Sequence, residues 1–126
     1  MEDQRTAINS YRDLLVWEAA VELAVSCYSA TKPFPNSEIY GMTSQIRRSS
    51  TSIAANIAEG HGRESTGVFI QFLRVAQGSL KELETHLILS GRVGLMPEND
   101  VTGLLGKADE IGRMLRSLVR SLQRKA

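Results

Sequence analysis

Four arginines near the carboxyl end of the chain have the spacing of a single helical stripe. Residues at steps of three and four lie on one face of an α-helix. The segment from position 107 to position 126 holds six basic and two acidic residues, a local net charge of +4. Guanidinium groups bind phosphate through paired hydrogen bonds, and cations of this kind release counterions from nucleic acids. The stripe therefore predicts contact with a phosphate backbone. Its members are Arg113, Arg116, Arg120 and Arg124.

A simpler interpretation of this stripe stays open, because most surface helices carry charged residues on the side away from the core. Arg47, Arg48 and Arg63 could extend the basic surface if the second and last helices are neighbours. Arg47 or Arg48 could instead pair with Glu38 or Glu59, and we favour that structural role.

No aromatic residue is interleaved with these basic residues in the sequence. Proteins that hold single strands without sequence preference stack the bases on aromatic side chains. The sequence therefore does not indicate a base-stacking platform. We expect contacts with the phosphate backbone and a weak preference for sequence.

Residues able to support catalysis are sparse. Glu82 and His86 lie one helical turn apart and could share a metal ion, although such a pair ordinarily forms a hydrogen bond on a helix surface. Di-iron bundles need two Glu-x-x-His pairs, and the sequence contains none. His61 has no Ser or Cys nucleophile in a recognised arrangement. We therefore expect no enzyme, no metal, no cofactor and no small-molecule substrate.

The helices that must position these residues are predicted by apolar residues at heptad spacing, interrupted by proline and glycine. No useful stretch alternates with period two, so strands are not expected. Four runs of apolar residues follow one another along the chain, and the second has the fewest members: Met42, Ile46, Ile53 and Ile57. The three stronger stripes are Leu14, Trp17, Val21, Ala24 and Tyr28; Phe69, Phe72, Ala76, Leu80, Leu83 and Leu87; and Leu104, Ala108, Ile111, Leu115, Leu118 and Leu122.

Local signals predict where these helices begin and end. Asp13 suits the start of the first helix, and Gly60 could take a left-handed conformation after the second. Ser65 is a predicted N-cap, Pro97 suits the first turn of the last helix, and Gly78 indicates close packing in mid-helix. The expected helices span about residues 13–31, 42–59, 65–90 and 97–124.

Short connections make consecutive helices antiparallel. The sequence therefore predicts an all-α fold, an antiparallel up-down-up-down four-helix bundle. Residues 1–126 form one expected domain, in which residues 1–10 are a flexible N-terminus. We expect polar residues on the packing faces to form an interhelical or intersubunit network. These residues are Asn56, Glu59, Glu84 and Thr85.

The location of the protein is also predicted. The one cysteine, Cys27, fits a reducing compartment and a position at the edge of the core. No apolar run approaches the 18 residues of a membrane-spanning helix, and the N-terminus lacks the pattern of a signal peptide. We expect a cytoplasmic protein with no membrane partner.

Several stretches, in this order along the chain, have a specific combination of motifs. They are residues 11–20 (YRDLLVWEAA), 34–48 (FPNSEIYGMTSQIRR), 52–60 (SIAANIAEG), Gly62-Arg63, Phe72-Leu73, Gly78-Ser79-Leu80 and 82–85 (ELET). With them the sequence resembles the four-helix-bundle family of 23S rRNA intervening-sequence proteins. Ala54 stands where that family often has proline, and Ser49-Ser50 where alanine is usual.

The resemblance implies a ring-like homopentamer. It also implies kinship with the accessory variability proteins of diversity-generating retroelements, which bind nucleic acid. Together with the arginine stripe, it predicts a non-enzymatic oligomeric protein that binds the backbone of RNA or DNA. The alternative is a structural or protein-interaction scaffold with no nucleic-acid ligand.

Overall fold

The computed structural model describes residues 10–125, so the expected flexible N-terminus lies outside it except for Ser10. This part of the chain contains no strand, which confirms the predicted all-α class. Two short 3-10 turns, η1 (Tyr11–Asp13) and η2 (Asn36–Glu38), accompany the long helices. The long helices are α2 (Leu15–Thr31), α3 (Met42–His61), α4 (Thr66–Arg92) and α5 (Glu98–Lys125).

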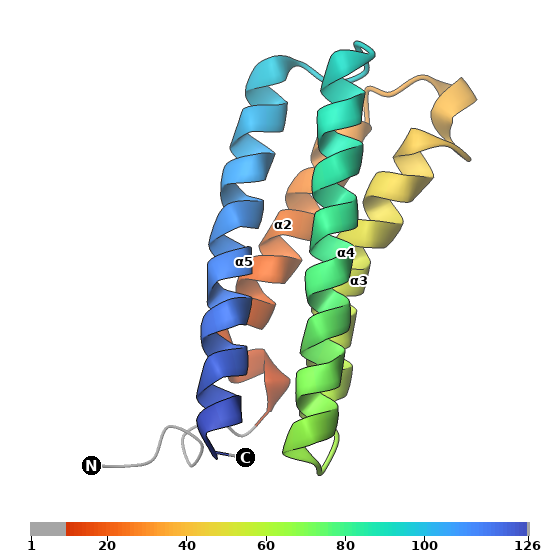
Figure 1. Cartoon of the computed structure of the whole chain (residues 1–126). Helices are drawn as coiled ribbons and strands as arrows, with labels where there is room; N and C mark the ends of the chain where they lie inside the picture. The colour runs from red at the N-terminus through yellow and green to blue at the C-terminus, as the bar shows by residue number, and fades with distance from the viewer. Residues whose placement is uncertain (1–9, 126) are drawn as a thin grey trace.

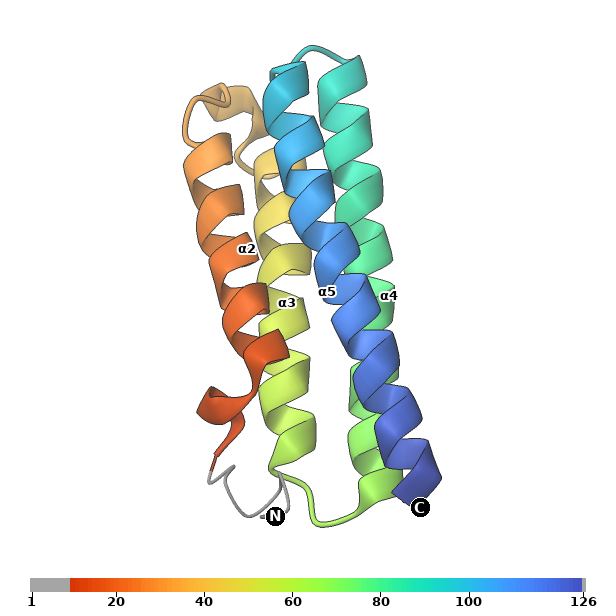
Figure 2. The same cartoon turned by 90° about the vertical axis from the view of Figure 1, so that its left-hand side faces the viewer.

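The four helices stand at the corners of a square, and consecutive helices run in opposite directions (Figure 1). Each of α2 and α4 contacts both α3 and α5, whereas α3 and α5 make no contact with each other. The α3–α4 loop and the end of α5 lie at the lower end of the bundle in both views, and the other two connections lie at the upper end (Figures 1 and 2). The predicted up-down-up-down bundle is therefore confirmed.

The core is a continuous apolar cluster contributed by all four helices. On α4 and α5 it follows the predicted stripes, except that Leu73 is the buried residue near the start of α4 while Phe69 and Phe72 are half-buried. Leu118 and Leu122 are also half-buried, because α5 reaches the open lower end of the bundle there. Three α3 isoleucines are fully enclosed: Ile46, Ile53 and Ile57.

The predicted stripe on the first helix is only partly correct. Leu14 and Ala24 are buried as predicted, and the other buried residues of α2 are Val16, Ala20, Leu23, Cys27 and Thr31. Tyr28 is exposed, and Trp17 and Val21 are half-buried. Apolar residues surround most of this helix, so spacing alone does not select one face.

Two predicted helix ends differ from the structure. The first helix begins after η1 with Leu14 as its N-cap, so Asp13 is not its starting residue. Gly60 is helical and buried, and α3 continues to His61. A Cβ atom on Gly60 would lie 2.5 Å from Cβ of Phe72, so α3 and α4 approach too closely for a side chain at this position. Gly60 is therefore required for packing and not for a left-handed turn.

Other local predictions have mixed outcomes. Ser65 is the N-cap of α4, and its hydroxyl accepts a hydrogen bond from Val68 N at 3.3 Å. The turn after α4 uses Gly94, whose φ of 82° favours glycine. A Cβ added to Gly78 would have no neighbouring atom within 4 Å. The prediction that another helix of this chain packs closely against Gly78 is therefore wrong within the described residues.

Cys27 of α2 is fully buried in the core, whereas the sequence predicted a position at its edge. Burial raises the pKa of its thiol to about 11, although a hydrogen bond with Ser50 of α3 and the charge of Lys107 of α5 act in the opposite direction. The thiol is therefore protonated at neutral pH and is a weak nucleophile.

Candidate nucleic-acid interface

The α5 arginines form the stripe that their spacing predicts. Arg113, Arg116, Arg120 and Arg124 are all exposed. None of them forms a hydrogen bond, ion pair or ring contact within residues 10–125, whereas the core side of the same helix is closed by Ile111, Leu115 and Val119. Arg124 also lies in the last turn of α5, where a positive charge favourably opposes the helix dipole. Within the described part of the chain, the stripe is thus a row of four guanidinium groups without partners.

Arg47 has very different surroundings. Its Nε donates a 3.0 Å hydrogen bond to Thr31 Oγ1, and its guanidinium carbon lies 4.6 Å from the centre of the Tyr28 ring. Thr31 Oγ1 in turn donates to the backbone oxygen of Cys27 at 2.8 Å. Arg47 therefore joins α3 to α2.

Arg63, in the α3–α4 loop, is also engaged. Its Nη2 forms a 3.0 Å ion pair with Glu59, and its guanidinium lies over the Phe72 ring at 5.2 Å. Glu38, the other expected carboxylate partner, accepts a hydrogen bond from Met42 N at 3.0 Å and so caps α3. The expected pairing of Arg47 or Arg48 with Glu38 or Glu59 is therefore wrong, although a structural role for Arg47 is correct.

A continuous basic surface required the second and last helices to be neighbours, and they are not, because α3 and α5 lie on a diagonal of the bundle (Figure 1). Arg47 and Arg48 consequently do not continue the α5 stripe within one chain. Arg63 does approach α5, and with Lys125 it lines a cavity of about 300 Å³ at the lower end of the bundle. The structure thus brings one of the three additional arginines to the end of α5.

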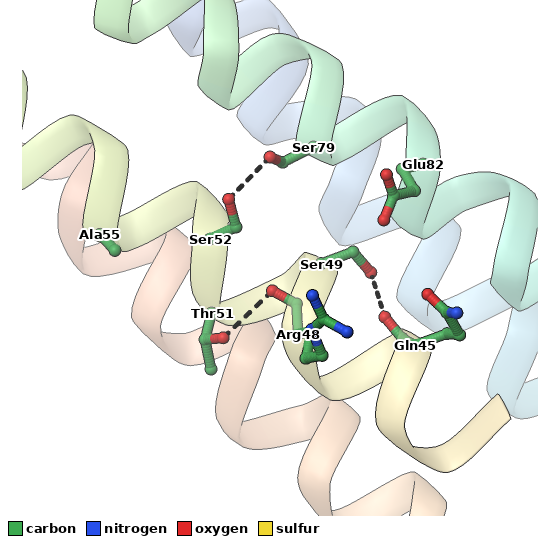
Figure 3. Close-up of a pocket in the computed structure, with 8 residues that line it drawn as sticks. All are labelled: Gln45, Arg48, Ser49, Thr51, Ser52, Ala55, Ser79 and Glu82. Atoms are coloured by element: carbon green, nitrogen blue, oxygen red, sulfur yellow. Dashed lines mark hydrogen bonds between the residues drawn. The ribbon is translucent and has the colours of Figure 1, made fainter. Parts of the chain in front are cut away.

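Arg48 lines a polar groove of about 450 Å³ between α3 and α4 (Figure 3). Ser52 and Ser79 share a 2.8 Å hydrogen bond across this groove. Glu82 extends from the α4 wall, but it forms no ion pair with Arg48. The Arg48 side chain therefore has no partner among the described residues, and it lies on a different face from the α5 stripe.

The groove hydroxyls do not form a catalytic arrangement in the part of the chain that the structure describes. Ser49 Oγ donates to Gln45 O at 2.8 Å, and Thr51 Oγ1 donates to Arg47 O at 2.9 Å. Nucleophilic catalysis needs a hydroxyl held by a base such as histidine or a carboxylate. These hydroxyls instead satisfy the backbone of their own helix.

The possible metal pair on α4 is a weak contact. His86 Nε2 lies 3.7 Å from Glu82 Oε1. Among residues 10–125, no three His, Cys, Asp or Glu side chains are grouped so that they could hold a metal ion. The pair lacks the third and fourth ligands of a protein metal site.

The predicted polar network forms only at Asn56. Its amide donates to Ser52 O at 2.8 Å and to Ser52 Oγ at 3.0 Å, and Ser52 continues the chain to Ser79 of α4. Glu59 pairs with Arg63 instead. Glu84 and Thr85 make local contacts with Lys81 on their own helix.

The contacts between basic and aromatic residues were not predicted from the sequence. Tyr28 and Arg47 come from different helices, and so no sequence interval connects them. The ion pair of Arg63 with Glu59, by contrast, has the i, i+4 spacing that is a recognisable helix signal. No aromatic residue is interleaved with the basic residues in the sequence, but in the folded protein Tyr28 and Phe72 contact Arg47 and Arg63.

Comparisons with known proteins agree with this architecture. The chain matches the family model of the 23S rRNA-intervening sequence protein over residues 12–117. No curated protein matches it. It is similar to the crystal structure of a protein of unknown function from the S23 ribosomal protein family of Bacteroides thetaiotaomicron. The two are 29% identical with a TM-score of 0.75, covering 83% of this chain and 98% of the other.

Among residues 10–125, each helix is too short or too polar to span a lipid bilayer.

The family match spans all four long helices, from η1 to the middle of the arginine stripe. This chain therefore belongs to the family of 23S rRNA-intervening sequence proteins.

Proposed function

We propose that this protein is a non-enzymatic, oligomeric, cytoplasmic protein that binds the phosphate backbone of RNA or DNA through the outer face of α5. The observation that carries the proposal is the row of four exposed arginines without a partner in the described chain. A free guanidinium gives up no intramolecular contact when it binds phosphate. Arg47 and Arg63 would lose their intramolecular contacts on binding phosphate, so we assign them a smaller contribution. Arg48 also contributes less, because it lies apart from the α5 stripe.

Counterion release provides the test. If four arginines of one subunit contact phosphates, the slope of log K against log salt should be about −3 to −4 per subunit. We expect Arg116→Glu with Arg120→Glu to weaken binding of a fluorescent RNA duplex by at least about a hundredfold at low salt. Binding that is insensitive to salt, or that survives this double substitution, would exclude the α5 site.

A matched control separates the site from total charge. Arg12→Glu with Lys32→Glu changes the net charge equally, at exposed positions outside α4 and α5. This variant should bind within about threefold of the wild type if binding is local to α5. Equal losses in both double variants would mean that the duplex responds only to the overall charge of the protein.

Self-association as a homopentamer is the second part of the proposal. The outer face of α4 supports it, because Val75, Leu89 and Val93 are exposed on one side with the open position of Gly78 between them. Several subunits on one strand would add avidity to weak phosphate contacts. Light scattering should give about 70 kDa, five times 13.9 kDa. A mass of one subunit would exclude this part.

A scaffold without a nucleic-acid ligand is the second candidate function. The structural engagement of Arg47 and Arg63 favours it, because arginines in this fold do serve packing. The scaffold predicts that the purified protein has the ultraviolet absorbance of protein alone and does not bind the duplex at low salt.

A further inference from the structure

An apolar groove lies on the surface where α2 meets α3. Its volume is about 540 Å³. Val21 and Ala24 of α2 and Ala54 of α3 supply apolar lining, and Tyr28 of α2 lines it as well. This volume lies within the range of pockets that hold small organic groups.

Tyr28 is both available and held in place. The residue is 43% exposed, and the guanidinium of Arg47 lies over its ring. Arg47 is itself fixed by its hydrogen bond to the buried Thr31. An aromatic ring held in this way loses little conformational freedom when a planar group stacks on it.

The charges around the groove favour an anionic ligand. Among the described residues that line it, Lys32 is the only charged one, and no carboxylate is present. Arg47 adds a second positive charge beside Tyr28. Thr51 places a hydroxyl at the α3 edge. An apolar lining, an aromatic ring and nearby cations are the elements that bind single-stranded nucleic acids.

We propose that this groove binds an unpaired base of a single-stranded nucleic acid, with the base against Tyr28 and its phosphate near Lys32. The inference rests on the proposed function, since it assumes a nucleic-acid ligand. It adds that the ligand includes an unpaired segment, because bases of a duplex are stacked on one another and cannot enter a side groove. No α5 residue lines this groove among the described residues, so substitutions in the groove and in the α5 stripe test the two sites independently.

The test uses a 12-nucleotide single strand containing 2-aminopurine, whose fluorescence falls when the base stacks on an aromatic ring. We expect the wild-type protein to quench it and Tyr28→Ala to abolish the quenching. The same substitution should raise Kd for the single strand by about five- to a hundredfold. It should leave Kd for an RNA duplex unchanged. Tyr40→Ala is the matched control, because Tyr40 is 95% exposed and does not line the groove.

A second variant fills the groove instead of emptying it. Thr51 is exposed on α3, so Thr51→Trp can be placed without burying the new ring in the core. It should weaken single-strand binding as Tyr28→Ala does, with an unchanged circular dichroism spectrum. Wild-type single-strand affinity in both variants would overturn the proposal.

The remaining outcomes separate the possible occupants. If Thr51→Trp lowers the assembly mass measured by light scattering, a second copy of this chain occupies the groove and the base-binding proposal is wrong. If the wild type binds the duplex through α5 but does not quench the single strand, only this inference fails. If it binds neither nucleic acid, the proposed function fails as well.

Discussion

Helices α3 and α5 stand on opposite corners of the bundle, and Arg47 of α3 differs in its surroundings from the arginines of α5. On α3, Arg47 is tied to Thr31 and lies over Tyr28, so this arginine serves as a connector between helices. On α5, the arginines from Arg113 to Arg124 have no partner in the described chain. Arginine in a surface pattern is therefore not by itself a sign of ligand binding. The presence or absence of an intramolecular partner distinguishes Arg47 from the α5 arginines within the described chain.

The buried faces of these helices differ as well. α3 packs closely on its neighbours through small residues, including Ser49, Ser50 and Gly60. α5 presents mainly larger apolar side chains, such as Leu104, Ile111 and Leu115. Close approach on the α3 side leaves little tolerance for added atoms, whereas α5 and the outer face of α4 have open positions at Gly106 and Gly78.

The largest expected effect concerns Cys27, which lies between Ser50 of α3 and Lys107 of α5. Its thiol ionises near 9.0 in the unfolded chain and near 11 in the folded protein. The unfolded state therefore loses its proton first, and stability is full below pH 9 and falls as pH rises toward 11. We expect a loss of about 2 to 3 kcal/mol over this range.

Urea denaturation at several pH values measures this loss. Other groups titrate in the same range, so the comparison is with Cys27→Ala, whose stability should decline less steeply by that amount. Parallel pH profiles for the two proteins would show that the thiol is not protected by burial.

The close packing of α3 predicts the next effect. Gly60→Ala places a Cβ 2.5 Å from Cβ of Phe72 and 3.0 Å from Cδ1 of Phe69, so the two helices must separate. We expect the free energy of unfolding to fall by about 2 kcal/mol, measured by urea denaturation. A variant as stable as the wild type would mean that α3 and α4 can move apart at little cost.

The contrast between the arginines gives a smaller effect. Arg47→Ala removes a hydrogen bond to buried Thr31 and the contact with Tyr28, and should destabilise the fold by about 1 to 2 kcal/mol. Arg113→Ala should change stability by less than about 0.5 kcal/mol, because Arg113 has no partner in the described chain. Equal losses in thermal or urea unfolding would remove the distinction between the two helices.

The smallest effect is a gain. Gly78 lies in the middle of α4 with open space around it, and alanine favours helix. Gly78→Ala should raise the free energy of unfolding by about 0.5 to 1 kcal/mol. Calorimetry and light scattering on the same sample check it. A loss of stability together with a lower assembly mass would indicate that another subunit packs against this glycine.

Much of the fold could be predicted because its signals are local. The stripes of α4 and α5 repeat within one helix, and the Ser65 cap acts over three residues. The stripe of α2 could not be predicted in the same way. Leu15 and Val25 are exposed although they are as apolar as the buried Val16 and Leu23, and only the neighbouring helices determine which side is covered.

The sequence alone determined the all-α class, the approximate positions of the four helices and the alignment of the α5 arginines, because each depends on residues within a few helical turns. Only the tertiary structure decided that α3 and α5 are diagonal. It also decided that Arg47 meets Thr31, sixteen positions earlier, and that Tyr28 lies beside a basic side chain. Those contacts join separate helices, and helical periodicity carries no information about which neighbour a surface residue will face.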